Sequence, residues 1–161
     1  WHQRLLSDWL KKNPCDYGIG WEPYPISLRI VNWIKWDLGL DNLSPSARQS
    51  LFLQGLTLEK KLEYHILGNH LFANAKALIF FGCYFEGKDS QRLLRKGFTI
   101  VNKELGIQVL DDGGNFELSP MYHCIFLEDV LDIINITNTF VFNLKKFVSV
   151  KFVLVINFFI F

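Results

Sequence analysis

Apolar residues recur along most of the chain at the three- and four-residue spacing of a helix, beginning with Trp1, Leu5 and Trp9. Strand-like alternation of apolar and polar positions is absent over residues 1–136. The spacing predicts helices at residues 1–10, 26–40, 45–67, 69–85, 90–106 and 122–136. Segments rich in Pro, Gly and polar residues separate them, at residues 12–25, 86–89 and 111–120. We therefore predict an all-α fold of successive antiparallel helical hairpins.

Two features define the helix predicted at residues 45–67. Ser44 is a good N-cap and Pro45 suits the first helical position, so the helix should begin there. Gly55 lies in its interior and marks a place where the helix is expected to bend.

The pattern changes at the C-terminal end. Residues 138–161 use only eight amino-acid types and include seven Phe. A strand fits the Val, Ile and Phe content, whereas a membrane anchor of about 20 apolar residues would be interrupted by lysines. A frameshift product also fits, because out-of-frame A/T-rich codons encode these eight types. We divide the chain into a helical domain, residues 1–136, and an atypical apolar tail, residues 137–161.

Composition narrows the class of protein. The 161 residues suffice for one domain with a core, and the 50% hydrophobic content excludes a disordered chain. The net charge of +1 gives no bulk attraction to nucleic acid. No C-x-x-C pair occurs, so neither a disulfide framework nor a zinc knuckle is expected. We expect all three cysteines to be buried thiols: Cys15, Cys83 and Cys124.

A first group of candidate polar residues comprises His65, Asn69 and His70. His65 and Asn69 would share a face if one helix ran through both, whereas His70 would lie further round. The spacing is not that of an H-E-x-x-H zinc helix, so no metal site is expected. A structural alternative is that Asn69 and His70 satisfy the helix junction after Gly68.

A second group follows about fifty residues later, in the segment "DDGGNFELSPMYH". Residues 111–114 read as a turn, and Ser119 and Pro120 resemble a helix start, which places Tyr122 and His123 in its first turn. A Tyr with an ordinary pKa near 10 is a poor base unless nearby positive charge favours the phenolate. Candidates for that charge are His123, Arg29, Lys60 and Lys61. A capping Ser followed by a packed Tyr ring is the structural alternative.

Three separated motifs together resemble the heparinase II/III-like polysaccharide lyases. They are "WEPYPISLRIVNWIKW" (21–36), "LEYHILGNHLFANAKALIFFGCYF" (62–85) and "ELGIQVLDDGGNFELSPMYHCIFLEDVLDI" (104–133). The resemblance covers residues 1–136. It implies a partial α/α toroid, followed in the family by a β-sandwich domain.

The resemblance also implies a reaction and a set of residues. These lyases cleave next to a uronic acid by β-elimination, without a redox cofactor or metal. The carboxylate must be neutralised, a base must remove the C5 proton and an acid must protonate the leaving oxygen. The implied catalytic residues are Asn69, His70 and Tyr122. The substrate-binding candidates are Trp21, Tyr24, Arg29, His65, Glu117 and His123, with the aromatic rings stacking on sugars.

The chain departs from the family pattern in ways that affect activity. No His follows His123, although the family uses another catalytic His from a later region. The β-sandwich and earlier toroid helices are also missing, so we expect a lyase fragment that is inactive alone. Its expected partner is an anionic polysaccharide, with no nucleic acid and no membrane span, and the resemblance suggests a periplasmic or cell-envelope location.

Two other functions remain open from the residues alone. One is a glycoside hydrolase on an α-toroid that uses two carboxylates such as Glu63 and Glu117. The other is a carbohydrate-binding remnant without catalysis.

Overall fold

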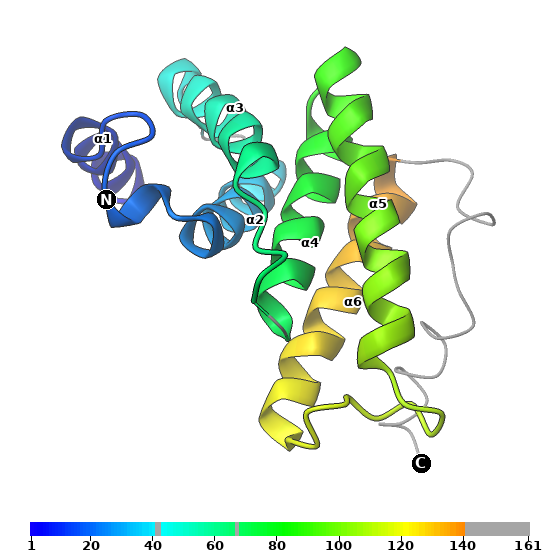
Figure 1. The fold of residues 1–161 in the computed structure, drawn as a ribbon. Coiled ribbons are helices and arrows are strands. Elements are labelled where there is room, and N and C mark those ends of the chain that lie inside the picture. The colour runs from blue at the N-terminus through cyan, green and yellow to red at the C-terminus, as the bar shows by residue number, and fades with distance from the viewer. Residues whose placement is uncertain (41–42, 67, 141–161) are drawn as a thin grey trace.

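The computed structural model describes residues 1–40, 43–66 and 68–140, and these are mostly helical (Figure 1). The elements are α1 (His2–Lys12), the short 3-10 helix η1 (Ile19–Trp21), α2 (Pro23–Leu40), α3 (Pro45–Lys60), α4 (Asn69–Tyr84), α5 (Lys88–Gln108) and α6 (Pro120–Phe140). Within these ranges there is no strand, and Val109 and Asn115 form an isolated antiparallel bridge. In the described part, no helix has the length and apolar character needed to cross a membrane.

Helix α4 is the central element. Every residue from Leu71 to Phe81 is buried, because α2, α3, α5 and α6 all pack against this helix. α4 and α5 form an antiparallel hairpin, and α6 returns alongside α4 in the same direction as α4 (Figure 1). α1 lies at the opposite edge of the array from α5 and α6. The prediction of an all-α array of antiparallel hairpins is confirmed.

Three element boundaries differ from the expectation by three residues or more. α2 begins at Pro23 rather than Ile26, because prolines are tolerated in a first turn that lacks amide partners. α3 begins as predicted, with the Ser44 hydroxyl accepting from the Ala47 N–H, but it ends at Lys60 rather than near Leu67. α6 continues past the expected end to Phe140.

Gly55 lies within α3, which is continuous from Pro45 to Lys60. A Cβ at this position would lie 2.2 Å from Cδ2 of Phe81. The glycine therefore makes room for an aromatic ring of α4, and the expected bend at this position stays a prediction.

Two of the three cysteines contradict the expectation of buried thiols. Cys15 and Cys124 are exposed, whereas Cys83 is partly buried. Burial raises the pKa of the Cys83 thiol to about 12. The three interpretations of the apolar tail concern residues that, beyond Phe140, lie outside the described ranges.

A buried ion network joins three helices. Lys76 of α4 is 6% exposed, and its ammonium group donates to Asp129 and, at 3.1 Å, to Asp132, both on α6. Asp132 also accepts from Lys35 of α2 at 2.7 Å. Burial disfavours the charge on Lys76, but the two carboxylates outweigh it and raise the pKa of Lys76. The network fixes α2 and α6 against the central helix.

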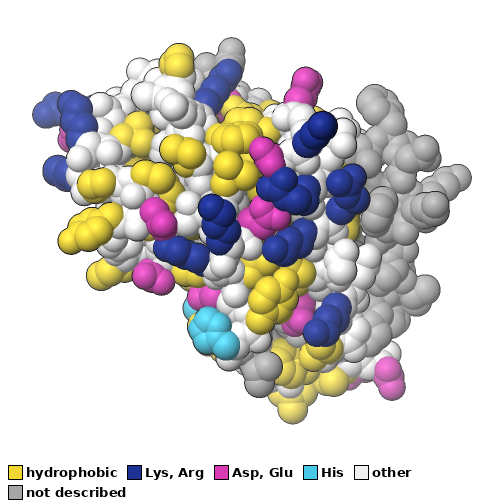
Figure 2. All heavy atoms as spheres, turned by 45° about the horizontal axis from the view of Figure 1, so that its top comes forward, with side chains coloured by type: hydrophobic (Ala, Val, Ile, Leu, Met, Phe, Trp, Pro, Cys, Tyr) yellow, Lys and Arg dark blue, Asp and Glu magenta, His cyan; other side chains and the backbone are white. Residues whose placement is uncertain are grey.

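On the molecular surface, charges of both signs are mixed. The face in Figure 2 shows basic side chains interspersed with acidic ones, rather than a broad patch of one sign among its described residues. Arg92 of α5, for example, donates to Glu59 of α3 at 2.9 Å and to Asp89 at 2.5 Å. This pattern agrees with the near-neutral net charge.

Candidate functional site

The two groups of polar residues lie at one end of the helical array. α4 and α6 both begin at the end drawn at the bottom of Figure 1. Asn69 and His70 are the first two residues of α4, and Tyr122 lies in the first turn of α6. The first turn of a helix carries free N–H groups and the positive end of the helix dipole. This end of the array therefore favours anionic groups.

Gly68 sets the direction in which α4 begins. Its φ of +88° lies in the left-handed region that glycine adopts readily. The Gly68 carbonyl accepts from Gln108 Nε2 of α5 at 3.0 Å. A Cβ at Gly68 would lie 2.8 Å from Glu117 Oε1, which places the substrate-binding candidate Glu117 directly beside the junction.

Asn69 keeps its side-chain amide uncommitted. Its side chain makes no hydrogen bond within the described part of the chain, and no side chain caps α4. The structural alternative, in which Asn69 and His70 satisfy the helix junction, therefore does not describe Asn69, whereas His70 does contact Glu63 in the connection before α4. A partly exposed amide at a helix start is available to donate to a bound anion.

His70 is held on two sides. Its ring stacks on Tyr24 of α2, with centroids 4.3 Å apart and planes 23° from parallel. Its Nδ1 lies 3.1 Å from Oε1 of Glu63, in the connection between α3 and α4. The His70 side chain remains 34% exposed, so part of the ring is open to a ligand.

A buried amide fixes Glu63 in turn. Glu63 is 6% exposed, and its Oε2 accepts from Nδ2 of Asn74 at 2.9 Å. The Glu63 backbone N–H donates to Oδ1 of Asn74 at 3.0 Å, and Asn74 Nδ2 also donates to Ser27 Oγ. The buried polar groups in this relay therefore have partners, as burial requires. Through these contacts, Glu63 in the connection after α3 is joined to α2 and α4.

Tyr24 couples this cluster electrostatically to α6. Burial raises the pKa of Tyr24, and the negative charge of Asp129 adds to the effect, partly opposed by Lys76. The negative charges of Glu63 and of the phenolate form of Tyr122 also raise the pKa of Tyr24. Tyr122 is therefore close enough to Tyr24 to interact with it electrostatically. Tyr24 therefore stays protonated at neutral pH and can donate a hydrogen bond.

His123 holds the loop before α6. It is 4% exposed, and its Nδ1 accepts from the backbone N–H of Asn115 at 3.0 Å. Burial lowers the pKa of His123, with Asp112 acting in the opposite direction. A neutral His123 is thus not the positive charge that a Tyr122 phenolate would need. The loop also lines a pocket of about 310 Å³ that includes His123.

Trp21 and Arg29 are engaged at the junction of α1, η1, α2 and α3. Arg29 donates to Gln54 Oε1 and to Gly20 O, each at 2.7 Å, and its guanidinium lies 4.1 Å from the ring centroid of Trp9. Burial lowers the pKa of Arg29 to about 10. Trp21 is 2% exposed, so neither face of its ring is open for a sugar in this conformation.

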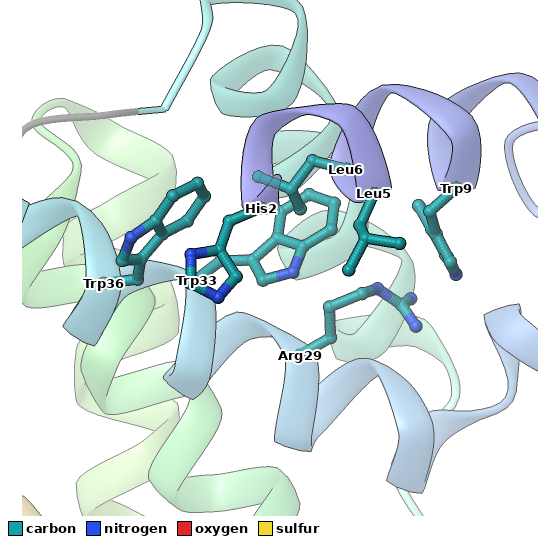
Figure 3. A pocket seen from close by; sticks show the side chains of 7 residues that line it. All are labelled: His2, Leu5, Leu6, Trp9, Arg29, Trp33 and Trp36. Carbon is teal, nitrogen blue, oxygen red and sulfur yellow. The ribbon is translucent and has the colours of Figure 1, made fainter.

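The pocket shown in Figure 3 lies at this same junction. It has a volume of about 510 Å³ and its walls come from α1 and α2. The lining residues are His2, Leu5, Leu6, Trp9, Arg29, Trp33 and Trp36. Arg29 is the charged residue among them, and two of its N–H groups donate to Gln54 and Gly20. The pocket therefore offers apolar surface but does not include the Asn69, His70 and Tyr122 motifs.

His65 and Asn69 do not share a helical face. α3 ends at Lys60 and α4 begins at Asn69, so His65 lies in a turn between them, where it is exposed. Among the described residues, no group of three or more His, Cys, Asp or Glu side chains is placed to hold a metal ion. Whether the assigned catalytic and substrate-binding residues act as expected stays a prediction.

The relay behind His70 was not predicted from the sequence. Glu63 was a candidate only as a hydrolase acid, and Asn74, Ser27 and Lys76 were not candidates. One signal was present, because Asn74 follows His70 by four residues, on the same face of an otherwise apolar helix. A buried polar residue at such a position needs partners.

A family model and two curated proteins match this chain. A family model described as the Heparinase II/III N-terminus matches residues 2–157, which extends past the expected end of the resemblance at Ile136. A heparin-sulfate lyase from Bacteroides stercoris is 30% identical over 171 residues, covering 88% of this chain and 25% of that protein. One from Pedobacter heparinus is 32% identical over 129 residues, covering 73% and 19%. The chain thus spans about a quarter of the length of the relatives it matches.

Solved structures share the fold. The crystal structure of heparan sulfate lyase HepC from Pedobacter heparinus superposes with a TM-score of 0.72 at 28% identity, covering 99% of this chain and 26% of that one. A crystal structure of heparinase III gives a TM-score of 0.77 at 19% identity, covering 98% and 25%, which is evidence of fold alone. The expected partial α/α toroid is confirmed.

Proposed function

The chain belongs to the heparinase II/III family, and from this membership we propose that it is part of a polysaccharide lyase that cleaves a uronic-acid-containing polymer by β-elimination. The observation that carries the proposal is the meeting of the start of α4, with Asn69 and His70, and the start of α6, with Tyr122, at one end of the array. Two curated relatives are named heparin-sulfate lyases, so heparan sulfate is the first polymer to test.

Asn69 is assigned to the substrate carboxylate. The C5 proton of a uronate is weakly acidic because the adjacent carboxylate is already negative. A donor that shares this charge stabilises the enolate-like intermediate, and preorganised donors of this kind typically contribute about 10²–10³-fold in rate. The uncommitted amide of Asn69 is suited to this role, because an amide donates without competing as a base. The adjacent start of α4 adds backbone N–H groups that favour an anion.

Tyr122 and His70 are assigned to proton transfer and charge stabilisation around the same sugar. In the elimination, the electrons of the C5–H bond form the C4=C5 double bond, and the C4–O bond breaks as the leaving oxygen takes up a proton. Tyr122 is assigned to this exchange of protons, with His70 beside Asn69 at the carboxylate. Tyr24, which stays protonated, is a hydrogen-bond donor in the same cluster.

The other substrate-binding assignments differ in support. Glu117 and His65 lie near the start of α4, so contact with a polymer bound there is sterically reasonable. Trp21, Arg29 and His123 are engaged within the protein, and their contact with substrate would require rearrangement. We therefore rank Asn69 and Tyr122 above them as the residues to test.

We propose that residues outside this chain complete the cleft. The chain spans 25% and 19% of the length of the two lyases it matches, and the family that it resembles has a further catalytic His and a β-sandwich after the helical region. On this proposal, the 161-residue chain alone should not turn over substrate.

A chimera tests the proposal directly. This chain replaces the matching quarter of the Bacteroides stercoris heparin-sulfate lyase, and the product is followed by near-ultraviolet absorbance of the unsaturated uronate. We expect absorbance to rise with the chimera and to fall by about 10²-fold or more with Asn69→Ala or Tyr122→Phe. Matched controls are Asn102→Ala and Tyr17→Phe, which change exposed residues outside the cluster.

The other outcomes separate the alternatives. New reducing ends without absorbance would indicate hydrolysis and refute the elimination. Binding of heparan sulfate by a folded chimera without cleavage would favour a non-catalytic role. The hydrolase alternative has little structural support, because both carboxylate oxygens of Glu63 already face protein partners.

A further inference from the structure

Glu63 has no role among the residues assigned to catalysis or substrate binding. It is a buried carboxylate whose Oε1 faces the ring of His70 and whose Oε2 faces Asn74. It belongs to none of the helices, because it lies in the connection between α3 and α4. Its position therefore depends on the contacts of its own side chain and backbone.

Asn74 binds one oxygen of Glu63 and leaves the other to face His70. The Glu63 backbone N–H can only donate, so the Asn74 atom that receives it is Oδ1. Nδ2 of Asn74 must then be the group facing Ser27 Oγ and Glu63 Oε2, at 3.0 and 2.9 Å. Both hydrogens of that amide are used. If the amide were rotated so that Oδ1 and Nδ2 exchanged places, two donors or two acceptors would face each other.

This arrangement decides where the proton of His70 resides. An ionised Glu63 accepts hydrogen bonds only, so the His70 nitrogen 3.1 Å from its Oε1 must carry hydrogen. In the neutral imidazole the proton is therefore on Nδ1, and Nε2 has a free lone pair. Tyr24 stacks on the ring at 4.3 Å and restricts its rotation. No hydrogen bond within the described part of the chain engages Nε2.

We propose that Glu63 is a positioning residue that holds His70 in the Nδ1–H tautomer, so that Nε2 is the nitrogen presented to the substrate. A partner on one ring nitrogen commonly determines the state of the other in histidines that act on ligands. Nε2 then accepts a hydrogen bond when the ring is neutral and donates one when the ring is protonated. The consequence for catalysis rests on the proposed lyase function, whereas the tautomer itself does not.

Nitrogen NMR of the whole 161-residue chain tests the proposal without substrate. Long-range ¹H–¹⁵N spectra distinguish a protonated from an unprotonated imidazole nitrogen. They are recorded at alkaline pH, so that the neutral ring is observed. We expect His70 to show a protonated Nδ1 and an unprotonated Nε2, the reverse of the tautomer that free histidine favours. A protonated Nε2 in the unaltered chain would overturn the proposal, whether or not any variant folds.

Glu63→Gln sharpens the test. Asn74 still presents its N–H to this side chain, so the oxygen of the new amide should face Asn74 and its NH₂ should face His70. An NH₂ group facing Nδ1 requires a lone pair there, so the protonation pattern of the two nitrogens should invert. Glu59→Gln removes an equally charged carboxylate that pairs with Arg92, and it should leave the His70 pattern unchanged. A folded Glu63→Gln chain that keeps the original pattern would refute the role of Glu63.

The two proposals fail separately. A chimera without elimination activity would refute the lyase function while the tautomer result stands. An inverted tautomer in the unaltered chain would refute the role of Glu63 while leaving the elimination assay untouched.

Discussion

The close contact between α4 and α5 leads to a quantitative prediction about two glycines. A Cβ added at Gly82 of α4 would lie 2.5 Å from Leu94 Cβ, 2.7 Å from the Ser90 carbonyl oxygen and 2.9 Å from Leu94 Cα. Ordinary carbon contacts lie at about 3.5–4.0 Å, so the two helices would have to separate by roughly 1 Å at this point. The obstructing atoms belong largely to the backbone, and they cannot move away as the end of a flexible side chain can.

The control is Gly106 of α5, where an added Cβ would have no described atom within 4 Å. Replacing a helical Gly with Ala gains about 1 kcal/mol at either site from helix propensity. Gly82→Ala also incurs an overpacking cost of about 1–3 kcal/mol. Gly106→Ala should therefore raise the free energy of unfolding by up to about 1 kcal/mol. The free energy of unfolding of Gly82→Ala should be about 1–3 kcal/mol lower than that of Gly106→Ala.

The assay is urea unfolding followed by far-ultraviolet circular dichroism, with both variants and the unaltered chain measured together. Each kcal/mol corresponds to a change of about 2–4 °C in Tm for a chain of this size, so thermal unfolding gives a second readout. If Gly82→Ala proves as stable as Gly106→Ala, the close approach of α4 and α5 is not as described. The result also bears on the site, because α4 carries Asn69, His70 and Asn74.

Three further predictions follow from groups outside the site. Asp37 is buried, which by itself would raise its pKa, but hydrogen bonds from Tyr84, the Leu43 N–H and Arg48 outweigh burial and leave the pKa of Asp37 below its ordinary value. A pKa that is lower in the folded than in the unfolded chain stabilises the fold at pH values above the unfolded pKa. This stabilisation is lost as the pH falls through the folded pKa. Below about pH 4, the free energy of unfolding should therefore fall less steeply with pH in Asp37→Asn than in the unaltered chain. Cys15 and Cys124 should react with an alkylating reagent at neutral pH, and Cys83 only after unfolding. Mass spectrometry of the labelled peptides is the measurement, and labelling of Cys83 in the folded chain would contradict the prediction. Truncation after Ile136 should lower the thermal stability more than truncation after Phe140, because Thr137 is fully buried and donates to Ile133 O at 2.6 Å; equal melting temperatures would contradict this.

The helical array was predictable because its signals are local. The N-cap at Ser44 and the turn at residues 111–114 require only neighbouring residues, and both occur as expected. The failures have a different origin. The sequence did not reveal that the missing side chain of Gly55 makes room for Phe81, a ring 26 positions away in the sequence. Likewise, α3 ends at Lys60, and the backbone N–H of Glu63 then donates to Asn74 of α4, a partner that no pattern within α3 reveals.

In the candidate site, too, some features were predictable from the sequence and others depended on the fold. Asn69, His70 and Tyr122 were identified because their motifs resemble a family, and the fold then brings the two motifs to one end of the array. The positive charge expected beside Tyr122 could not be located from sequence. Arg29 proves to be committed to Gln54 and Gly20, and burial disfavours charge on His123. The choice between these cations depended on burial and on hydrogen bonds across helices, which spacing along one helix does not encode.

The relay from Asn74 through Glu63 to His70 shows why such a site needs the surrounding fold. Each hydrogen bond in it joins residues 7 to 47 positions apart, from α2, α4 and the connection after α3. A buried carboxylate is costly unless its oxygens are satisfied, so Glu63 can be retained only where α2 and α4 bring Ser27 and Asn74 together. Once those contacts exist, the proton position on His70 follows from donor and acceptor chemistry alone. The chemistry presented to a substrate is therefore set by the packing of two helices. A change at Asn74 should alter His70 although the relay between them runs through Glu63.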